Sequence, residues 1–280
     1  MGGTLWLVGT PIGNLGDLAP RARDTLAAVD LIAAEDTRRT GRLLKGFEIN
    51  KPLISLFEGN ERDRTDELLV RLRAGTSVAL VTDGGMPAIS DPGFRLIRAC
   101  AEDGIDVRVV PGPSAAVAAL VISGLPTDRF SFEGFLPRKR GDRMRRLEAL
   151  RDDPRTLVVF ESPLRVQVLL RDVLVAFGDR RVAVARELTK LHEEVHRGRA
   201  SDVLARLGDA PLKGEVVVVI DGAGRGGAPD AESGVEEARG LVANGMRKRD
   251  AARAVGERHG LPANEIYRAL VASPGEPARH

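Results

Sequence analysis

The feature that most constrains the fold is the stretch at residues 77–93, in which a short apolar run is followed closely by two glycines. The sequence is SVALVTDGGMPAISDPG, and its segment 78–82 is typical of a strand buried on both faces of a parallel sheet. Asp83, Gly84 and Gly85 end this strand, and paired glycines let the backbone turn tightly and approach a ligand. Open α/β sheets bind small molecules at this end of their strands, although an ordinary strand-to-helix turn has the same composition.

Two further loops in the N-terminal half have a similar composition. A strand predicted at 5–8 is followed by residues 9–14, GTPIGN, and a strand predicted at 107–110 is followed by residues 111–115, PGPSA. Ser114 is placed to cap the helix that comes next, so the free amide groups of that helix would face an anion or a carboxylate. Three such exits from one sheet predict a single binding edge.

The order of the predicted elements indicates an α/β protein with more than one core. Single cores stop growing near about 250–300 residues, so 280 residues favour two lobes and a tail. The segment from Gly222 matches G-x-G-x-x-G by letter, but Pro229 follows where a helix is needed, which predicts a linker. The tail resembles a helix-turn-helix module, with a packing appendage as the alternative. We expect an N-terminal α/β lobe at 1–122, a C-terminal α/β lobe at 123–224, a flexible linker at 225–234 and a helical tail module at 235–280.

Composition argues against several classes of protein. No apolar run approaches the roughly 18 residues of a membrane span and no signal segment opens the chain, so we expect a cytoplasmic protein without a membrane partner. Cys100 is the only cysteine and is predicted to be a buried structural thiol. His192 and His196 match H-E-x-x-H by letter, but their surroundings predict an extended segment, and we expect no metal.

Positive charge is concentrated in one short segment although the net charge is only +2. Residues 137–146, PRKRGDRMRR, hold six cations against one carboxylate. Such a block is either a solvated helix face or a surface for a polyanion. Aromatic residues make up only 4%, which argues against a platform of stacked bases, so phosphate contacts would dominate nucleic-acid binding.

Eight stretches carry a longer pattern over almost all of residues 4–222. They are GTPIGNLGDLAPRA from Gly9, AAEDTRRT from Ala33, DGGMPAISDPG from Asp83, VVPGPSA from Val109, SGLPTDRFSFEGFLPRK from Ser123, FESPLRV from Phe160, RELTKLHEE from Arg186 and KGEVVVVIDG from Lys213. In this order they resemble the ribosomal RNA small subunit methyltransferase I family of the tetrapyrrole methylase-like superfamily. Two stretches depart from the family's pattern: its S-D-A-G-T-P is TDGGMP here, and a histidine-containing stretch is FEGN at residues 57–60.

The resemblance implies the fold, the cofactor and the substrate. The fold is the two-lobed tetrapyrrole methylase-like (class III S-adenosylmethionine methyltransferase) fold, usually a homodimer, with S-adenosyl-L-methionine between the lobes. The reaction is 2′-O-methylation of a cytidine ribose in the decoding region of 16S rRNA, at cytidine 1402, in free rRNA or in the small ribosomal subunit. The implied cofactor-binding residues are Thr10, Pro11, Ile12, Gly13, Asp83, Gly84, Gly85, Met86, Pro87, Ile89, Ser114 and Ala115 in the first lobe, and Phe160, Leu188 and Gly214 in the second.

Methyl transfer to a hydroxyl needs in-line positioning and a base. The candidates are Glu35, Asp36, Glu161, Glu187 and Lys190, of which we favour Glu35–Asp36 and Lys190. A lysine serves only if its pKa is lowered, and Asp36 is equally well placed to cap the following helix. The cations expected to hold the RNA backbone are Arg38, Arg138, Lys139, Arg140, Arg143 and Arg165.

Two alternative functions remain open from the residues. The first keeps the fold and changes the substrate to a corrin or another tetrapyrrole, although the basic segment suits a polyanion better. The second is an rRNA-binding assembly factor without catalysis, although the glycine loops favour retained cofactor binding. A cofactor titration separates the second alternative from the enzyme.

Overall fold

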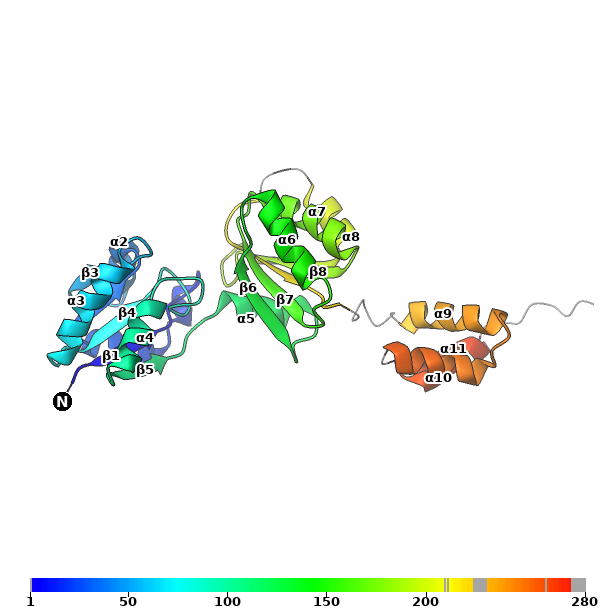
Figure 1. Ribbon diagram of the computed structural model, residues 1–280, viewed down its shortest axis with the longest axis horizontal. Coiled ribbons are helices and arrows are strands. Elements are labelled where there is room, and N and C mark those ends of the chain that lie inside the picture. The colour runs from blue at the N-terminus through cyan, green and yellow to red at the C-terminus, as the bar shows by residue number, and fades with distance from the viewer. Residues whose placement is uncertain (1, 209, 211, 224–230, 260, 273–280) are drawn as a thin grey trace, which may run out of the picture.

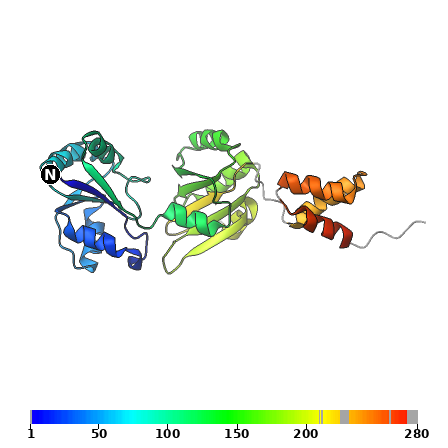
Figure 2. The ribbon, with the colours of Figure 1, turned by 90° about the horizontal axis from the view of Figure 1, so that it is seen from below.

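The computed structural model describes residues 2–208, 210, 212–223, 231–259 and 261–272. Three bodies follow one another along the chain in both views, two α/β lobes and a helical module (Figures 1 and 2). Residues 224–230, which hold most of the predicted linker and of the G-x-G-x-x-G match, lie outside the described residues. The first helix of the module begins at Ala231, inside the segment that the sequence predicted as linker.

The first lobe is a parallel five-stranded sheet in the order β3-β2-β4-β1-β5. Every residue of β2 and β4 is buried, because helices cover both faces of the sheet. The strands are β1 (Thr4–Val8), β2 (Leu31–Ala34), β3 (Leu53–Ser55), β4 (Val78–Val81) and β5 (Asp106–Val110). The helices are η1 (Leu15–Asp17), α1 (Pro20–Ala28), α2 (Thr37–Gly46), α3 (Glu61–Arg73) and α4 (Phe94–Glu102). The parallel sheet predicted from the buried run at 78–82 is confirmed.

Neighbouring strands β1 and β4 send their helices to opposite faces of this sheet. Leu26 of α1 packs in the core on one face, whereas Leu96 and Cys100 of α4 pack in the core on the other. A crevice opens at the carboxyl ends of two adjacent strands whose connections diverge in this way. Cys100 is fully buried, as predicted, and burial raises the pKa of its thiol to about 11.

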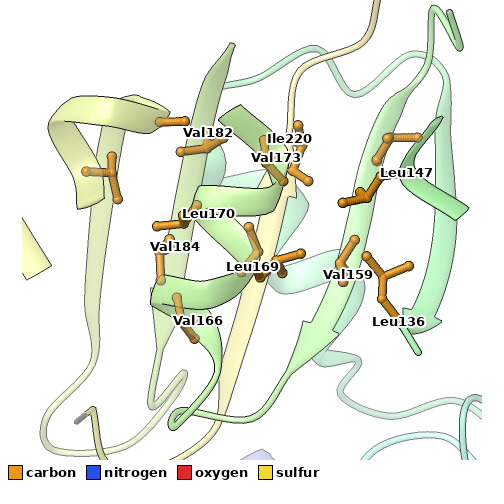
Figure 3. Close-up of a cluster of buried hydrophobic side chains, with 14 of the residues drawn as sticks. Leu136, Leu147, Val159, Val166, Leu169, Leu170, Val173, Val182, Val184 and Ile220 are labelled. Carbon is orange, nitrogen blue, oxygen red and sulfur yellow. The ribbon is translucent and has the colours of Figure 1, made fainter. Parts of the chain in front are cut away.

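The second lobe is a mixed sheet in the order β6-β7-β10-β8-β9. Only β6 and β7 run parallel, and the other neighbouring pairs are antiparallel. The strands are β6 (Phe130–Phe135), β7 (Thr156–Glu161), β8 (Arg181–Arg186), β9 (Glu194–Arg199) and β10 (Val216–Ile220), and the helices α6 (Arg140–Leu150), α7 (Val166–Phe177) and α8 (Ala200–Leu207) cover one face. Figure 3 shows Leu169, Leu170 and Val173 of α7 pointing toward strand residues such as Val159 and Val184.

Helix α5 (Ala115–Ser123) covers the opposite face of this second sheet. Ala119 and Leu120 pack with Val158 of β7, Ala183 of β8 and Val219 of β10. The predicted boundary after residue 122 assigned this helix to the first lobe, but its packing assigns it to the second. The helix is apolar all round, so the sequence gives no face that would choose between the two sheets.

The helical module has a core of its own. Helices α9 (Ala231–Ala243), α10 (Lys248–His259) and α11 (Ala263–Ala272) pack on one another through Val235, Val255, Ile266 and Leu270. No helix of the described ranges is both long and apolar enough to cross a membrane.

Candidate functional site

The three glycine-rich loops predicted to converge do meet at one edge of the first sheet. Thr10 and Gly85 exchange two backbone hydrogen bonds of 3.0 Å, which join the loop after β1 to the loop after β4. A Cβ atom on Gly112, in the loop after β5, would lie 2.8 Å from Cα of Gly9. A Cβ atom on Gly84 would lie 3.1 Å from the carbonyl oxygen of Pro11. Glycine is required here because backbone packs directly on backbone.

A cavity of about 750 Å³ opens between these loops and the second lobe. A cavity of this size holds a drug-sized or cofactor-sized molecule. Its walls include every residue predicted to bind the cofactor except Pro87, which does not line it. The sequence reasoning missed Arg42 and Leu43 of α2 and Phe135 of β6, which also line it. Their positions depend on how α2 and β6 are folded against the loops, which no local motif encodes.

Backbone strain is concentrated in the two loops that face each other across this cavity. Ala88 and Ser90, after β4, have φ angles of 66° and 63°, and Glu187 and Thr189, after β8, have φ angles of 52° and 66°. Each left-handed residue other than glycine costs of the order of 1 kcal/mol, which the surrounding contacts must offset. Such outliers cluster at functional sites, and here they occur in two loops that supply lining residues from both lobes, among them Ile89 and Leu188.

Carboxylates of the first lobe are connected beneath the cavity. Glu35 Oε2 accepts a hydrogen bond of 3.2 Å from the amide of Asp83, and Asp83 Oδ1 accepts one of 3.2 Å from the amide of Asp36. Asp83 Oδ2 pairs with Nη1 of Arg39 at 2.8 Å. Burial raises the pKa of Glu35, the amide of Asp83 opposes this shift, and the charge of Asp83 adds to it.

Asp36, one half of the favoured Glu35–Asp36 pair, does not line the cavity. Its carboxylate caps α2, accepting hydrogen bonds of 2.8 Å and 3.4 Å from the amides of Arg38 and Arg39. Hydrogen bonds from the side chain and the amide of Arg38 lower the pKa of Asp36. The sequence left open whether Asp36 is a site residue or a helix cap, and in the structure it caps α2.

The contacts of Lys190 do not favour its predicted role as a base. Its ammonium group lines the cavity and contacts Oε1 of Glu187 at 2.8 Å and Oε2 of Glu215 at 3.2 Å. Burial lowers the pKa of Lys190, but hydrogen bonds to the two carboxylates outweigh burial and the net shift is upward. A lysine with a raised pKa stays protonated. Glu187 also accepts the amide of Glu215 at 2.9 Å, and the hydrogen bond from Lys190 lowers the pKa of Glu187, which does not line the cavity.

Asp91 is a lining residue that the sequence reasoning missed. Burial, followed by the charge of Glu35, raises the pKa of Asp91 to about 6; the Thr82 hydroxyl opposes this shift and the charge of Asp83 adds to it. Its only local signal was a carboxylate in the loop that leaves the central strand. Whether that carboxylate faces the cavity depends on the left-handed turns at Ala88 and Ser90.

Arg143, predicted to bind RNA phosphates, is buried in the second lobe. Its side chain is 5% exposed and its Nη2 contacts Oδ2 of Asp172 at 2.7 Å. Its Nη1 donates to the carbonyl oxygens of Pro137 and Arg138. All these contacts are internal, so Arg143 has a structural role and is not part of a phosphate-binding surface.

The other predicted RNA-binding cations differ in their exposure. Arg138, Lys139 and Arg140 lie exposed around the start of α6, and Arg38 lies exposed on α2. Arg165 is only 26% exposed and pairs with Glu161 of β7 at 2.5 Å.

Of the two histidines of the H-E-x-x-H match, His196 lies in strand β9, as the predicted extended segment requires, whereas His192 lies in a turn. In the part of the chain that the structure describes, no group of three or more His, Cys, Asp or Glu residues is arranged to hold a metal ion.

Comparisons with known proteins place this site in a family. A family model described as Tetrapyrrole (Corrin/Porphyrin) Methylases matches residues 4–204. The chain is 47% identical to "Ribosomal RNA small subunit methyltransferase I" of Synechocystis sp., over 95% of this chain and 96% of the relative. It is 42% identical to the Escherichia coli O157:H7 protein of the same name, over 98% and 96%. The protein of that name from Thermotoga maritima is 50% identical, over 79% of this chain and 99% of the relative.

Solved structures agree on the fold. Uroporphyrin-III C-methyltransferase from Thermus thermophilus aligns with a TM-score of 0.55 at 24% identity, covering 78% of this chain and 94% of that one. Diphthine synthase aligns with a TM-score of 0.58 at 14% identity, covering 78% and 89%. These identities are low enough that the structures establish the fold alone. The match to residues 4–204 and the 41–50% identities of the curated relatives show that the chain belongs to the ribosomal RNA small subunit methyltransferase I family, within the tetrapyrrole methylases.

Proposed function

We propose that this protein transfers a methyl group from S-adenosyl-L-methionine to a ribose 2′-hydroxyl of 16S rRNA, at the decoding-region cytidine 1402 that the family resemblance implies. The observation that carries the proposal is the cavity lined by Gly84 and Gly85, at the carboxyl ends of β1 and β4. It occurs in a chain 47% identical to a protein named for methylating small subunit rRNA. The same proposal makes the protein cytoplasmic, because its substrate is there, and a homodimer, as the resemblance implies.

The residues around the cavity fit this cofactor. Gly84 and Gly85 line the cavity, and a Cβ atom on Gly84 would crowd the Pro11 carbonyl oxygen, whereas Gly112 lets its loop pack directly on Gly9. Ser114 caps α5, whose first amides suit the cofactor's carboxylate. Phe160 and Leu188 supply an apolar wall from the second lobe. When bound, S-adenosyl-L-methionine supplies an electrophilic methyl group on a positively charged sulfur.

The chain's own contribution to the reaction is positioning and proton removal. The two lobes line one cavity, so they can hold the methyl donor and the hydroxyl in line. Because sulfonium is a good leaving group, this positioning alone accounts for a large part of the decrease in the activation barrier. Lys190 stays cationic and orders Glu187 and Glu215 on the second wall. The proton of the 2′-hydroxyl therefore goes to a carboxylate that lines the cavity.

Exposed cations on both lobes suit the RNA backbone. Arg42 lines the cavity from α2, Arg38 lies exposed on the same helix, and Arg138, Lys139 and Arg140 lie exposed on the second lobe. Phosphate contacts of this kind position a substrate without reading its sequence. Choice of the target nucleotide then depends on which ribose reaches the cavity.

The proposal is tested with small ribosomal subunits from cells that lack this methylation. The purified protein and labelled S-adenosyl-L-methionine are incubated with these subunits or with free 16S rRNA, and the modified nucleotide is mapped. We expect one ribose methyl group on the decoding-region cytidine. Cofactor binding without transfer to either RNA would reject the proposal and favour a tetrapyrrole substrate, whereas an absence of cofactor binding would favour an assembly factor.

A further inference from the structure

The proposed reaction requires a proton acceptor, and the hydrogen bonds of the cavity narrow the choice. The carboxylates that line it are Glu35, Asp83, Asp91, Glu161 and Glu215. A carboxylate paired with a cation or holding backbone amides favours its ionised form and is a weak base. A base also needs a free oxygen that a substrate hydroxyl can reach. Each carboxylate is therefore judged by its partners.

Two of the five are held by arginines and by backbone amides. Asp83 contacts Arg39 at 2.8 Å with one oxygen and accepts an amide hydrogen bond with the other. Glu161 Oε1 contacts Arg165 at 2.5 Å and accepts the amide of Ser162 at 2.6 Å. Its Oε2 has no hydrogen-bond partner, but the side chain is only 1% exposed, so a substrate hydroxyl does not reach it. Both carboxylates serve to order the walls of the cavity.

Glu215 is excluded for a similar reason. Its Oε2 contacts Nζ of Lys190 at 3.2 Å, and its side chain is 68% exposed to solvent on the second-lobe wall. Glu35 is half-buried and accepts the amide of Asp83 through Oε2, so one oxygen is already engaged in joining β2 to β4. Among the described residues neither Glu35 nor Asp91 has a cation within 4 Å, and Asp91 is the one of the two whose carboxylate holds no backbone amide.

The loop that carries Asp91 is held in one conformation. The amide of Ala88 bonds to the carbonyl of Pro92 at 3.3 Å, and the amide of Gly93 bonds to Oε1 of Glu61 at 2.9 Å. Left-handed turns at Ala88 and Ser90 fix its path. Strained, well-anchored backbone is typical of a loop that must place one side chain accurately.

We propose that Asp91 is the general base that removes the proton from the ribose 2′-hydroxyl. The inference rests on the proposed function and names the residue that performs its proton transfer. The 2′-oxygen gives its proton to the carboxylate of Asp91 while it forms a bond to the methyl carbon. The carbon–sulfur bond breaks, and its electron pair stays on sulfur, which becomes neutral.

The surroundings of Asp91 suit this role. Burial raises its pKa to about 6, with further upward contributions from Glu35 at the end of β2 and Asp83 at the end of β4. Arg39 of α2, the nearby cation, is held on Asp83, and Glu61 of α3 is held by the backbone of the same loop. A base with this pKa is ionised near neutral pH but accepts a proton more readily than an ordinary aspartate.

The test compares Asp91→Asn with Asp24→Asn, which removes an exposed carboxylate of α1 outside the cavity. Loss of a general base typically costs about 10²–10⁴-fold in rate. We expect a loss of this size in single-turnover methyl transfer to the 30S subunit for Asp91→Asn, with cofactor affinity by calorimetry within about threefold of wild type. Asp24→Asn should match the wild type in both measurements.

A pH profile separates proton transfer from a structural role. With both substrates limiting, the rate of the wild type should rise with pH through about 6 and then level off, because Asp91 must be ionised. Glu35→Gln removes a like charge beside Asp91, so this rise should move to lower pH. A rate for Asp91→Asn within tenfold of wild type, a loss of cofactor binding equal to its loss of rate, or an unmoved profile in Glu35→Gln would overturn the proposal. A wild type that transfers no methyl group would instead reject the proposed function.

Discussion

Two arginines of the basic segment contact the same carboxylate from very different environments. Arg143 and Asp172 are 5% and 3% exposed, whereas Arg140, which contacts Asp172 at 3.1 Å, is 70% exposed. The sequence predicted both arginines to bind RNA. We now predict that Arg143→Met destabilises the second lobe strongly and that Arg140→Met barely changes its stability.

The structure sets the expected magnitudes. Arg143 donates one hydrogen bond to Asp172, contacts it a second time through Nη2 at 2.7 Å, and donates two hydrogen bonds to the carbonyls of Pro137 and Arg138. Removing one partner of a buried ion pair costs about 3–5 kcal/mol, because the remaining charge stays buried. Since Arg140 still contacts Asp172 in the variant, we expect the lower end, about 3 kcal/mol. Arg140 is mostly exposed and Asp172 keeps its buried partner Arg143 when Arg140 is removed, so the expected change for Arg140→Met is about 0–1 kcal/mol, as for a surface ion pair.

Urea unfolding measures both variants. Far-ultraviolet circular dichroism follows the helices of all three bodies, and the fluorescence of Trp6, the only tryptophan, follows the first lobe. Arg143→Met should lower the urea midpoint that is measured by circular dichroism. The midpoint that is measured by Trp6 fluorescence should not change. Equal free energies of unfolding for the two variants, or weaker rRNA binding by a fully stable Arg143→Met protein, would refute the structural role of Arg143.

Three further predictions concern the cavity and the tail. Gly84→Val should weaken S-adenosyl-L-methionine binding at least about tenfold in calorimetry, at a temperature where the variant is folded, because its side chain would crowd the Pro11 carbonyl and displace the loop. Unchanged affinity would contradict a cofactor site between these loops. Lys190→Arg, which keeps the charge and removes any base, should keep more than about a tenth of the transfer rate, and a larger loss would restore Lys190 as a candidate base. Deletion of residues 225–280 should leave cofactor affinity and the unfolding midpoints of both lobes unchanged, because α9–α11 pack on one another; lower midpoints would contradict an independent module.

The parts of the fold that were predictable are those set by local composition. The buried run at 78–82 predicted a central parallel strand, and glycines at three strand ends predicted loops that meet, because the ends of parallel strands share one edge. The cap at Ser114 and the extended segment around His196 are local as well. Each of these features depends on residues that are close together in the sequence.

The parts that were not predictable depend on partners distant in the sequence. Arg143 is structural because Asp172 lies beside it, and Lys190 stays protonated because Glu187 and Glu215 flank it. The pKa of Asp91 is raised first by burial and then by the charge of Glu35, which lies 56 residues earlier in the chain. The charges of these groups were visible in the sequence, but their pKa values follow from tertiary contacts alone.

The first-lobe wall of the cavity consists largely of backbone, whereas the second-lobe wall consists of side chains. This difference explains why methionine is tolerated at position 86, where the family pattern has threonine. The first-lobe wall is largely backbone, with Gly9 in contact with Gly112 and with a Cβ atom on Gly9 placed 2.7 Å from the sulfur of Met86. The Met86 side chain thus occupies space that only a glycine at position 9 leaves open. The second-lobe wall depends on side chains, including the ion pair of Lys190 with Glu187. A side-chain change is therefore tolerated on the first wall as long as the glycines remain, whereas the second wall depends on each charged partner.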